Sequence, residues 1–261
     1  MAYDYEYFKK AVYDLTKINL DAYKEKQMKR RIDTLIAKNK IVGYDKYVAA
    51  LKENNRMFEE FVNYLTINVS EFYRNPDQWQ IMDKEIIPDL IQRFGKNLKI
   101  WSAACSTGDE PYSLVMAFSK HIPLNQIKIN ATDLDKQVIA KAKAGLYGEK
   151  SIASVPDEFK RKYFTKIGPS YQISDEIKSR VEFKEHNLLK DTYPTDCNLI
   201  VCRNVLIYFT EEAKEDVFRK FQKSLKPGGF LFIGSTEQII NHKDIGYVRR
   251  SSYYYERPIN S

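Results

Sequence analysis

The stretch IWSAACSTGDEPYSLVMAF, residues 100–118, has the pattern of a buried strand, a turn of small residues with one glycine, and an apolar helix. Pro111 falls near the first turn of that helix, where a missing backbone N–H is harmless. A strand that turns through glycine into a helix usually offers the helix N-terminus to a phosphate. Here Asp109 and Glu110 occupy that position and would repel one. The stretch therefore predicts a strand–turn–helix unit whose ligand is not held through a phosphate.

The alternation of strand and helix continues toward the C-terminus. Apolar, strand-like segments occupy residues 98–105, 127–135, 181–189, 198–209 and 230–237. Helical patterns occupy residues 135–145 and 211–229, and the second ends in a Pro-Gly-Gly turn. Strands and helices in this order predict a parallel, doubly wound sheet of the α/β class, which binds ligands beyond the carboxyl ends of its strands.

Two segments depart from this alternation. Within residues 147–180, YFTKIGPSYQIS (163–174) has the pattern of a hairpin around Gly168 and Pro169. This region is expected to form a small inserted β-subdomain. The closing YVRRSSYYYERP (247–258) alternates like an antiparallel edge hairpin.

The first 75 residues contain helical patterns and no convincing strand. In YKEKQMKRRIDTLIAK (23–38) one helix face is apolar, with Met28, Ile32, Leu35 and Ile36. A second helix repeats the pattern with Phe58, Phe61, Val62 and Leu65. The opposite face of the first helix carries Lys24, Lys26, Lys29, Arg30 and Lys38, which either solvate the helix or meet an acidic partner. We expect a basic helical domain (1–75), a linker with a connecting helix (76–97) and an α/β domain (98–261) with its insertion at about 147–180.

Composition excludes several classes of protein. The 261 residues are 43% hydrophobic and carry a formal charge of +7, which suggests an acidic partner. The three cysteines have no C-x-x-C spacing and are expected in the core, and the histidines are scattered, so no metal site is expected. No apolar run is long enough to span a bilayer, and MAYDYEYFKK (1–10) lacks the apolar core of a signal peptide. We expect a cytoplasmic protein without membrane insertion.

The acids after the first strand favour a cationic ligand. A dinucleotide-binding turn needs G-x-G-x-x-G, and this loop has only Gly108. S-adenosylmethionine carries an ammonium group and a sulfonium and has no phosphate. Asp133, which ends the second strand, lies where doubly wound folds place an acid that accepts hydrogen bonds from ribose hydroxyls. The alternatives are that Asp109 and Glu110 only favour a helix N-terminus and that Asp133 only caps the next helix.

Six segments together resemble the successive motifs of one family. They are INVSEFYRNPDQW, WSAACSTGDEPYSLVM, ATDLDKQVIAKAKAGLY, FKEHNLL, LIVCRNVLIYF and LKPGGFLFIGSTE. In order and spacing they are similar to those of the chemotaxis receptor methyltransferases, the CheR family. The resemblance covers nearly the whole chain. It implies a small N-terminal all-helical domain, a doubly wound, Rossmann-like S-adenosylmethionine methyltransferase domain, and an inserted β-subdomain that in some members docks a receptor tail peptide by strand addition.

The resemblance also implies roles for particular residues. The positions that match the family's cofactor contacts are Asn68, Ser70, Arg74, Glu110, Asp133, Asn187, Leu188, Asn204 and Val205. Arg74 would pair with the cofactor's carboxylate, and Glu110 would meet its ammonium group. Tyr208 falls near the methyl-transfer centre and, with Arg74, is the expected catalytic residue, although a buried core aromatic is the alternative.

The activity that the resemblance implies is O-methylation of glutamate side chains on chemoreceptors for sensory adaptation. The products are γ-methyl esters and S-adenosylhomocysteine. A glutamate is ionised at neutral pH, so no general base is required. Receptor helices rich in glutamate would dock on a basic surface formed by Lys26, Lys29, Arg30 and Arg31. We expect a monomer.

Two rival functions stay open. A nucleic-acid methyltransferase would share the cofactor fold, but Asn204 is followed by VLIYF instead of the prolines and aromatic residue that grip a flipped base, and no cysteine follows a proline. We therefore expect no nucleic-acid partner. The other rival is a catalytically silent S-adenosylmethionine-binding adaptor in a signalling array.

Overall fold

The computed structural model describes residues 3–259 and divides the chain into two compact units. The helical unit comprises the chain up to Asn68 together with Leu206–Asp216. The sheet unit comprises Val69–Val205 and the chain from Val217 onward. This division differs from the expected one, which ended the helical domain at residue 75 and left the whole of 98–261 in the α/β domain.

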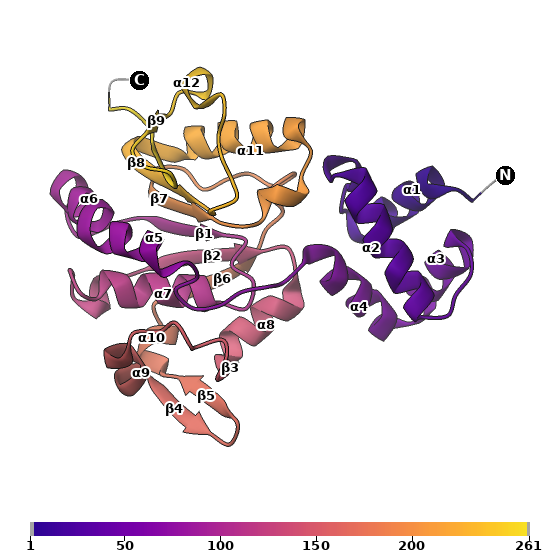
Figure 1. Ribbon diagram of the computed structural model, residues 1–261, viewed down its shortest axis with the longest axis horizontal. Coiled ribbons are helices and arrows are strands. Elements are labelled where there is room, and N and C mark those ends of the chain that lie inside the picture. The colour runs from indigo at the N-terminus through magenta and orange to yellow at the C-terminus, as the bar shows by residue number, and fades with distance from the viewer. Residues whose placement is uncertain (1–2, 260–261) are drawn as a thin grey trace. The chain divides into compact units, whose positions relative to one another are not determined.

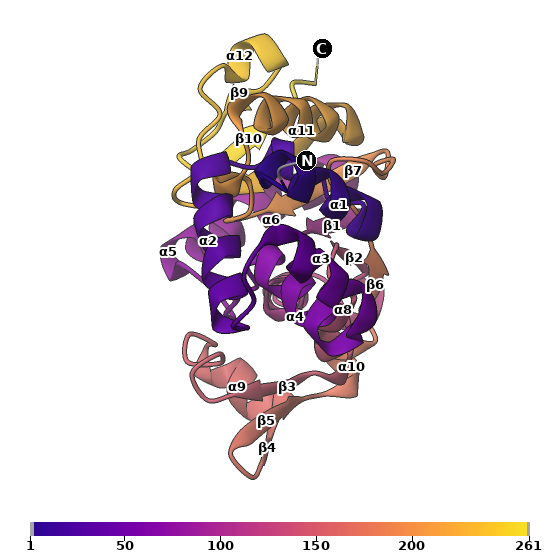
Figure 2. The same cartoon turned by 90° about the vertical axis from the view of Figure 1, so that its right-hand side faces the viewer.

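The helical unit is built from four N-terminal helices, α1–α4, which Figure 2 shows in indigo and violet. Their bounds are α1 Tyr5–Thr16, α2 Glu25–Lys38, α3 Tyr44–Glu53 and α4 Asn55–Thr66, with a 3₁₀ turn at Leu20–Ala22. Asp4 caps α1 by accepting the N–H of Tyr7, and Asn54 caps α4 by accepting that of Met57. The apolar face predicted for α2 is confirmed, because Met28, Ile32, Leu35 and Ile36 are all buried.

The segment Leu206–Asp216 belongs to the helical unit through contacts distant in sequence. Tyr23 and Phe209 form an isolated antiparallel bridge, and their rings meet edge to face with centroids 4.9 Å apart. The N–H of Lys24 donates to the carbonyl of Tyr208 at 2.9 Å. These long-range pairs place the 3₁₀ turn Leu206–Tyr208 against the N-terminal helices, which a reading of local patterns could not detect.

The sheet unit contains a seven-stranded sheet of order β6-β2-β1-β7-β8-β10-β9, visible in Figure 1. The strands are β1 Ile100–Ala103, β2 Ile129–Asp133, β6 Val181–Glu185, β7 Cys197–Cys202, β8 Leu225–Ile233, β9 Val248–Arg249 and β10 Tyr254–Glu256. Pairs among β6, β2, β1, β7 and β8 are parallel, and β10 is antiparallel to both β8 and β9. The predicted doubly wound α/β fold with an antiparallel edge is confirmed.

Helices cover both faces of this sheet. Their bounds are α5 Pro76–Ile81, α6 Ile87–Phe94, α7 Asp109–Phe118, α8 Lys136–Ala144, α11 Glu211–Ser224 and α12 His242–Ile245, with a π-helical turn at Met82–Ile86 and a 3₁₀ turn at Leu124–Gln126. Trp101 pairs with Asn130 of β2, and Phe183 pairs with Ala131, the next residue of that strand. Successive residues of a strand point to opposite faces of the sheet, so Trp101 and Phe183 lie on opposite faces. Trp101 packs on Phe221 of α11, whereas Phe183 packs on Tyr112 of α7.

The insertion forms its own three-stranded antiparallel sheet of order β3-β5-β4, which lies with α9 in Figure 2. Its elements are β3 Leu146–Gly148, α9 Asp157–Tyr163, β4 Phe164–Ile167, β5 Ser170–Ile173 and α10 Asp175–Lys178. The predicted hairpin is confirmed, with Gly168 in the turn at φ 57°. The hydroxyl of Tyr147 donates to the carbonyl of Thr107, which ties this subdomain to the loop after β1.

The three cysteines are free and buried, as expected for core residues. Within residues 3–259, no helix has both the length and the apolar character needed to cross a membrane.

Candidate functional site

The carboxyl ends of four neighbouring strands, β6, β2, β1 and β7, form the candidate site. The loop after β1 crosses the end of β2, where the N–H groups of Ala104 and Cys105 both donate to the carbonyl of Thr132 at 2.8 Å. The N–H of Ser106 then donates to the carboxylate of Asp133, also at 2.8 Å. The first strand, its loop and the acid that ends the second strand are thereby brought together as the sequence predicts.

The loop after β1 has an unusual backbone. Ala104, Ser106 and Gly108 have φ values of 71°, 49° and 88°, a left-handed conformation that costs non-glycine residues energy. Gly108 is required for a second reason, since a Cβ atom there would lie 2.8 Å from the Cβ of Ala142 on α8. This tight approach closes the turn and starts α7 at Asp109, which puts Glu110 in the first turn of that helix.

Asp133 is 7% exposed and accepts backbone N–H groups from Ser106 at 2.8 Å, from Asp135 at 3.0 Å and from Leu134. These bonds fix the carboxylate, whose two oxygen atoms together offer about four acceptor positions. Burial raises the pKa of Asp133 to about 6, although the backbone hydrogen bonds oppose that shift. The residue is a rigid acceptor that retains capacity for further donors, and it does not merely cap α8, because Asp135 caps that helix.

Glu110 is a second acid at this edge, and its side chain is 12% exposed. Its carboxylate accepts the hydroxyl of Ser102 at 2.8 Å and lies 3.8 Å from the Nη1 atom of Arg203. Burial raises the pKa of Glu110 to about 6, with the charge of Arg203 acting against the rise and that of Glu237 adding to it. A cationic ligand group would favour its ionised form.

Asp109 is not expected to meet the cationic ligand, because its carboxylate is hydrogen-bonded within the chain. It is fully buried, and the hydroxyls of Thr107 and Ser151 donate to it, as does that of Ser70. Burial raises the pKa of Asp109, and these hydroxyl bonds oppose the rise. Asp109 therefore joins three segments: the predicted cofactor residue Ser70, the loop after β1 and the start of the insertion.

Arg203 is a buried cation at this edge that the sequence analysis missed. It is 7% exposed, and its Nη2 atom donates to the carbonyl of Arg74 at 2.7 Å and to the side-chain oxygen of Gln78 at 2.6 Å. Its guanidinium also lies 4.7 Å from the ring centroid of Phe232. Arg203 thus fixes the turn that carries Arg74 beside Glu110. The signal in the sequence was a charged residue directly after the mostly apolar segment that forms β7, every residue of which is buried.

The residues after β6 and β7 form turns at the same edge. Asn187 accepts the N–H of Leu189 at 2.9 Å through its side chain, and Leu188 is buried. Asn204 has φ 61°, and Glu237 accepts the N–H groups of Asn204 and Val205 at 2.8 and 3.0 Å. The predicted residues Asn187 and Leu188 therefore follow β6, and Asn204 and Val205 follow β7, at the same edge of the sheet as expected. Glu237 is a second residue that the sequence analysis overlooked.

Two predicted site residues belong to the helical unit. The side-chain amide of Asn68 donates to the hydroxyl of Thr66 at 2.9 Å, and Tyr208 lies in the 3₁₀ turn that follows Val205. Tyr208 is partly exposed and so is not a fully buried core aromatic. The roles of Asn68 and Tyr208 toward the cofactor stay predictions.

The basic surface of α2 is smaller than expected. Lys26 and Arg30 are exposed, and Lys29 lies 3.8 Å from Asp33 with 45% of its side chain exposed. Arg31 instead donates to the carbonyl of Tyr64 on α4 at 2.6 Å and stacks 4.5 Å from the centroid of its ring. Arg31 therefore holds two helices of the unit together, and we assign the available basic surface to Lys26, Lys29 and Arg30.

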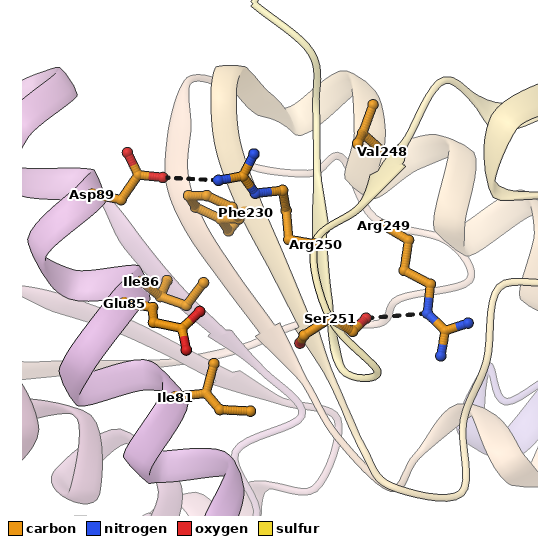
Figure 3. A pocket seen from close by; sticks show the side chains of 9 residues that line it. All are labelled: Ile81, Glu85, Ile86, Asp89, Phe230, Val248, Arg249, Arg250 and Ser251. Atoms are coloured by element: carbon orange, nitrogen blue, oxygen red, sulfur yellow. Dashed lines mark hydrogen bonds and ion pairs between the residues drawn. The ribbon is translucent and has the colours of Figure 1, made fainter.

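A cavity of about 320 Å³ in the sheet unit lies apart from this edge (Figure 3). It is lined by Ile81, Glu85, Ile86, Asp89, Phe230, Val248, Arg249, Arg250 and Ser251. Arg250 lies 3.8 Å from Asp89 and 3.4 Å from Glu256, and Arg249 donates to the carbonyl of Ser251 at 3.1 Å. Its lining contains none of the residues at the ends of β1, β2, β6 and β7, and its arginines are engaged within the chain.

Comparisons with known proteins identify the family of the chain. Residues 68–254 match the family model described as CheR methyltransferase, SAM binding domain, and residues 3–66 match CheR methyltransferase, all-alpha domain. The chain belongs to the CheR methyltransferase family. A chemotaxis protein methyltransferase of Listeria innocua is 40% identical over 97% of this chain and 96% of its own length. One from Borreliella burgdorferi is 30% identical over 94% of this chain and 91% of its own.

Membership of the CheR family confirms S-adenosylmethionine as the cofactor. The described residues fit it, because a cationic nucleoside without phosphate matches a strand edge with two buried acids. Glu110 would hold the ammonium group and Asp133 the ribose hydroxyls.

Cofactor binding by this CheR-family chain should depend on pH. Glu110 and Asp133 have pKa values of about 6, and a bound cation favours the carboxylate form of Glu110, so binding should release protons when the pH approaches 6. We expect affinity for S-adenosylhomocysteine to be constant above pH 7 and to fall, by up to about tenfold per pH unit per acid, below pH 6. Calorimetry in buffers of different ionisation enthalpy measures the protons directly. A constant affinity from pH 5 to 8 would contradict the assignment.

Proposed function

We propose that this protein transfers the methyl group of S-adenosylmethionine to glutamate side chains of chemoreceptors and forms γ-methyl esters. The observation that carries the proposal is the pair of acids, the mostly buried Glu110 and the buried Asp133, at neighbouring strand ends of a chain that belongs to the CheR family. Relatives that align over nearly their whole length are named chemotaxis protein methyltransferases, which supports a role in chemotaxis.

In this proposal the chain binds and orients its reactants and moves no proton. Arg74 binds the cofactor's carboxylate, Glu110 its ammonium group, Asp133 its ribose, and the turn at Asn187 and Leu188 its adenine. The bound cofactor supplies an electrophilic methyl group on its sulfonium. A substrate glutamate with an ordinary pKa near 4.3 is already a nucleophilic carboxylate at neutral pH. Alignment of the two groups accounts for about 7 to 11 kcal/mol of barrier reduction in favourable cases.

The arrangement of histidines is consistent with a reaction that needs no general base. His121 follows α7, and its Nε2–H donates to the carboxylate of Asp83 at 2.8 Å. His186 follows β6, but its ring packs against Trp101 and Tyr193. Within residues 3–259, neither imidazole ring forms a hydrogen bond with the carboxylate of Glu110 or Asp133, so we assign no proton transfer to them.

The experiment that tests the proposal measures methyl transfer to a receptor fragment. The purified protein, S-adenosylmethionine with a labelled methyl group and a glutamate-bearing cytoplasmic receptor fragment should yield label that alkali releases, because carboxyl esters hydrolyse in base and methylated amines do not. Replacing the receptor glutamates by glutamine should abolish the label. Stable label, label on added tRNA or DNA, or cofactor binding without any transfer would each overturn the proposal.

The exposed basic surface of α2 is proposed to attract the acidic receptor helices. We expect the triple variant Lys26→Glu, Lys29→Glu, Arg30→Glu to raise the KM for receptor by about tenfold at low salt, because charge reversal turns steering into repulsion. The KM for the cofactor should not change. Arg31 is left intact because its contact with Tyr64 holds α2 to α4.

The control for this variant is Lys46→Glu with Lys52→Glu, two exposed cations of α3. These changes also lower the net charge but act on a different helix, so receptor KM should shift less. If the α2 variant keeps the receptor KM of the unchanged protein from low to high salt, then α2 is not the docking surface.

A further inference from the structure

Glu237 lies in the loop that follows β8, and its carboxylate accepts three backbone N–H groups. The donors are Asn204 at 2.8 Å, Val205 at 3.0 Å and Gly234 at 2.7 Å. Glu237 is only 8% exposed, so these charge-assisted bonds lie in a poorly solvated place where each is strong. One side chain therefore links the turn after β7 to the turn after β8.

The two turns also approach one another closely. A Cβ atom on Gly234 would lie 2.8 Å from the backbone nitrogen of Asn204 and 2.7 Å from an Oε atom of Glu237. Only glycine leaves room for this contact. Asn204 itself has φ 61°, a conformation that persists when surrounding contacts impose it. Glu237 and Gly234 supply such contacts.

Asn204 retains an acceptor for a ligand. Its Oδ1 atom is buried and has no hydrogen-bond partner among residues 3–259. A buried carbonyl oxygen without a donor is costly, and a bound ligand that donates a hydrogen bond would remove that cost. The N–H groups of Asn204 and Val205 are already bonded to Glu237, so the Oδ1 atom of Asn204 is what remains for a ligand. This acceptor suits a cationic cofactor that donates hydrogen bonds.

We propose that Glu237 is a positioning residue for S-adenosylmethionine: it holds the turn after β7 in the conformation that presents Asn204 and Val205 to the cofactor, and its charge strengthens the negative field around Glu110. The proposal rests on the assignment of Asn204 and Val205 as cofactor contacts. It does not depend on which methyl acceptor the enzyme uses.

The test is the affinity of the full chain for S-adenosylhomocysteine, measured by calorimetry at 25 °C in Glu237→Gln. A glutamine turns one of its two acceptors into an NH₂ group that faces backbone donors, so we expect the Kd to rise about 10- to 100-fold. We also expect the acid limb of the pH profile to move to lower pH. Burial raises the pKa of Glu110 most, Arg203 and Arg74 lower it, and the carboxylate of Glu237 raises it, so removal of the Glu237 charge should lower this pKa while burial still raises it.

Glu256→Gln is the matched control. Glu256 is a buried carboxylate of β10, 6% exposed and paired with Arg93 at 2.5 Å, so its loss should lower the melting temperature without moving the pH profile of binding. An unchanged Kd in Glu237→Gln, or an equal rise in Glu256→Gln, would overturn the proposal.

A measurement on the unchanged protein covers the case in which Glu237→Gln does not fold. The N–H groups of Asn204 and Val205 should exchange slowly with solvent deuterium, because Glu237 holds both. Exchange of these two amides at the rate of an unprotected chain would also refute the proposal. The methyl acceptor is not needed in any of these measurements, so a failure here is distinct from a failure of the receptor methylation assay.

Discussion

Replacing Asp133 by asparagine should weaken binding of S-adenosylhomocysteine about 100-fold or more while the protein stays folded. Asp133 already receives the N–H groups of Ser106 and Asp135, and the ribose hydroxyls would be further donors to the same carboxylate. A hydrogen bond to a charged group contributes about 1.5–3 kcal/mol, and an asparagine lacks both the charge and one of the two acceptor atoms. Titration calorimetry gives the Kd, and a thermal melt checks the fold.

The control for Asp133→Asn is Glu185→Gln. Glu185 ends β6 and is the register partner of Asp133, but its side chain is 50% exposed and pairs on the surface with Lys136. Glu185→Gln removes one negative charge from the same sheet edge, so it changes the long-range electrostatic attraction for a cation about as much as Asp133→Asn does. If both variants weaken binding equally, the effect of Asp133 comes from net charge and the ribose assignment fails.

Replacing Arg203 by methionine should lower the free energy of unfolding by about 3–5 kcal/mol, the usual effect of breaking a buried charge pair. Arg203 offsets the charge of Glu110 and satisfies oxygen atoms of Arg74 and Gln78. Its loss should raise the pKa of Glu110 further above the unfolded value. Stability should therefore fall as pH rises through that range, and the deficit should be larger at pH 7 than at pH 5. Urea unfolding at both pH values measures it.

Two further variants measure how much of the Arg203→Met effect comes from the ion pair with Glu110. Arg161→Met removes an exposed cation of α9 and should change the free energy of unfolding by less than about 0.5 kcal/mol. The double variant Glu110→Gln with Arg203→Met should be more stable than Arg203→Met alone at pH 7, because no buried carboxylate is then left without its partner. Equal stability of the single and double variants would show that Arg203 acts only through its hydrogen bonds.

Local patterns predicted much of the fold because burial follows the period of each element. The four apolar residues of α2, the β4–β5 hairpin and the order of strands and helices all follow from residues close together in sequence. The positions of Glu110 and Asp133 followed too, since parallel strands end at one edge.

The residues that the sequence analysis missed or misjudged act over long separations. Arg203 contacts the turn at Arg74, Glu237 contacts Asn204, and Arg31 contacts Tyr64, each more than 30 positions away. No local pattern separates a buried arginine that holds a turn from an exposed one that binds a partner. The carbonyl or carboxylate that meets each side chain decides its role, and only the folded chain brings the two together.

The non-contiguous helical unit has a consequence for the exchange of parts between relatives. Leu206–Asp216 completes this unit through contacts with Tyr23 and Lys24. A hybrid enzyme that takes only its first 68 residues from a relative would therefore combine the relative's helices with the 3₁₀ turn of this chain. The mismatch would fall on the stretch that carries Tyr208. A transplant of the intact helical unit should therefore move two pieces of gene at once.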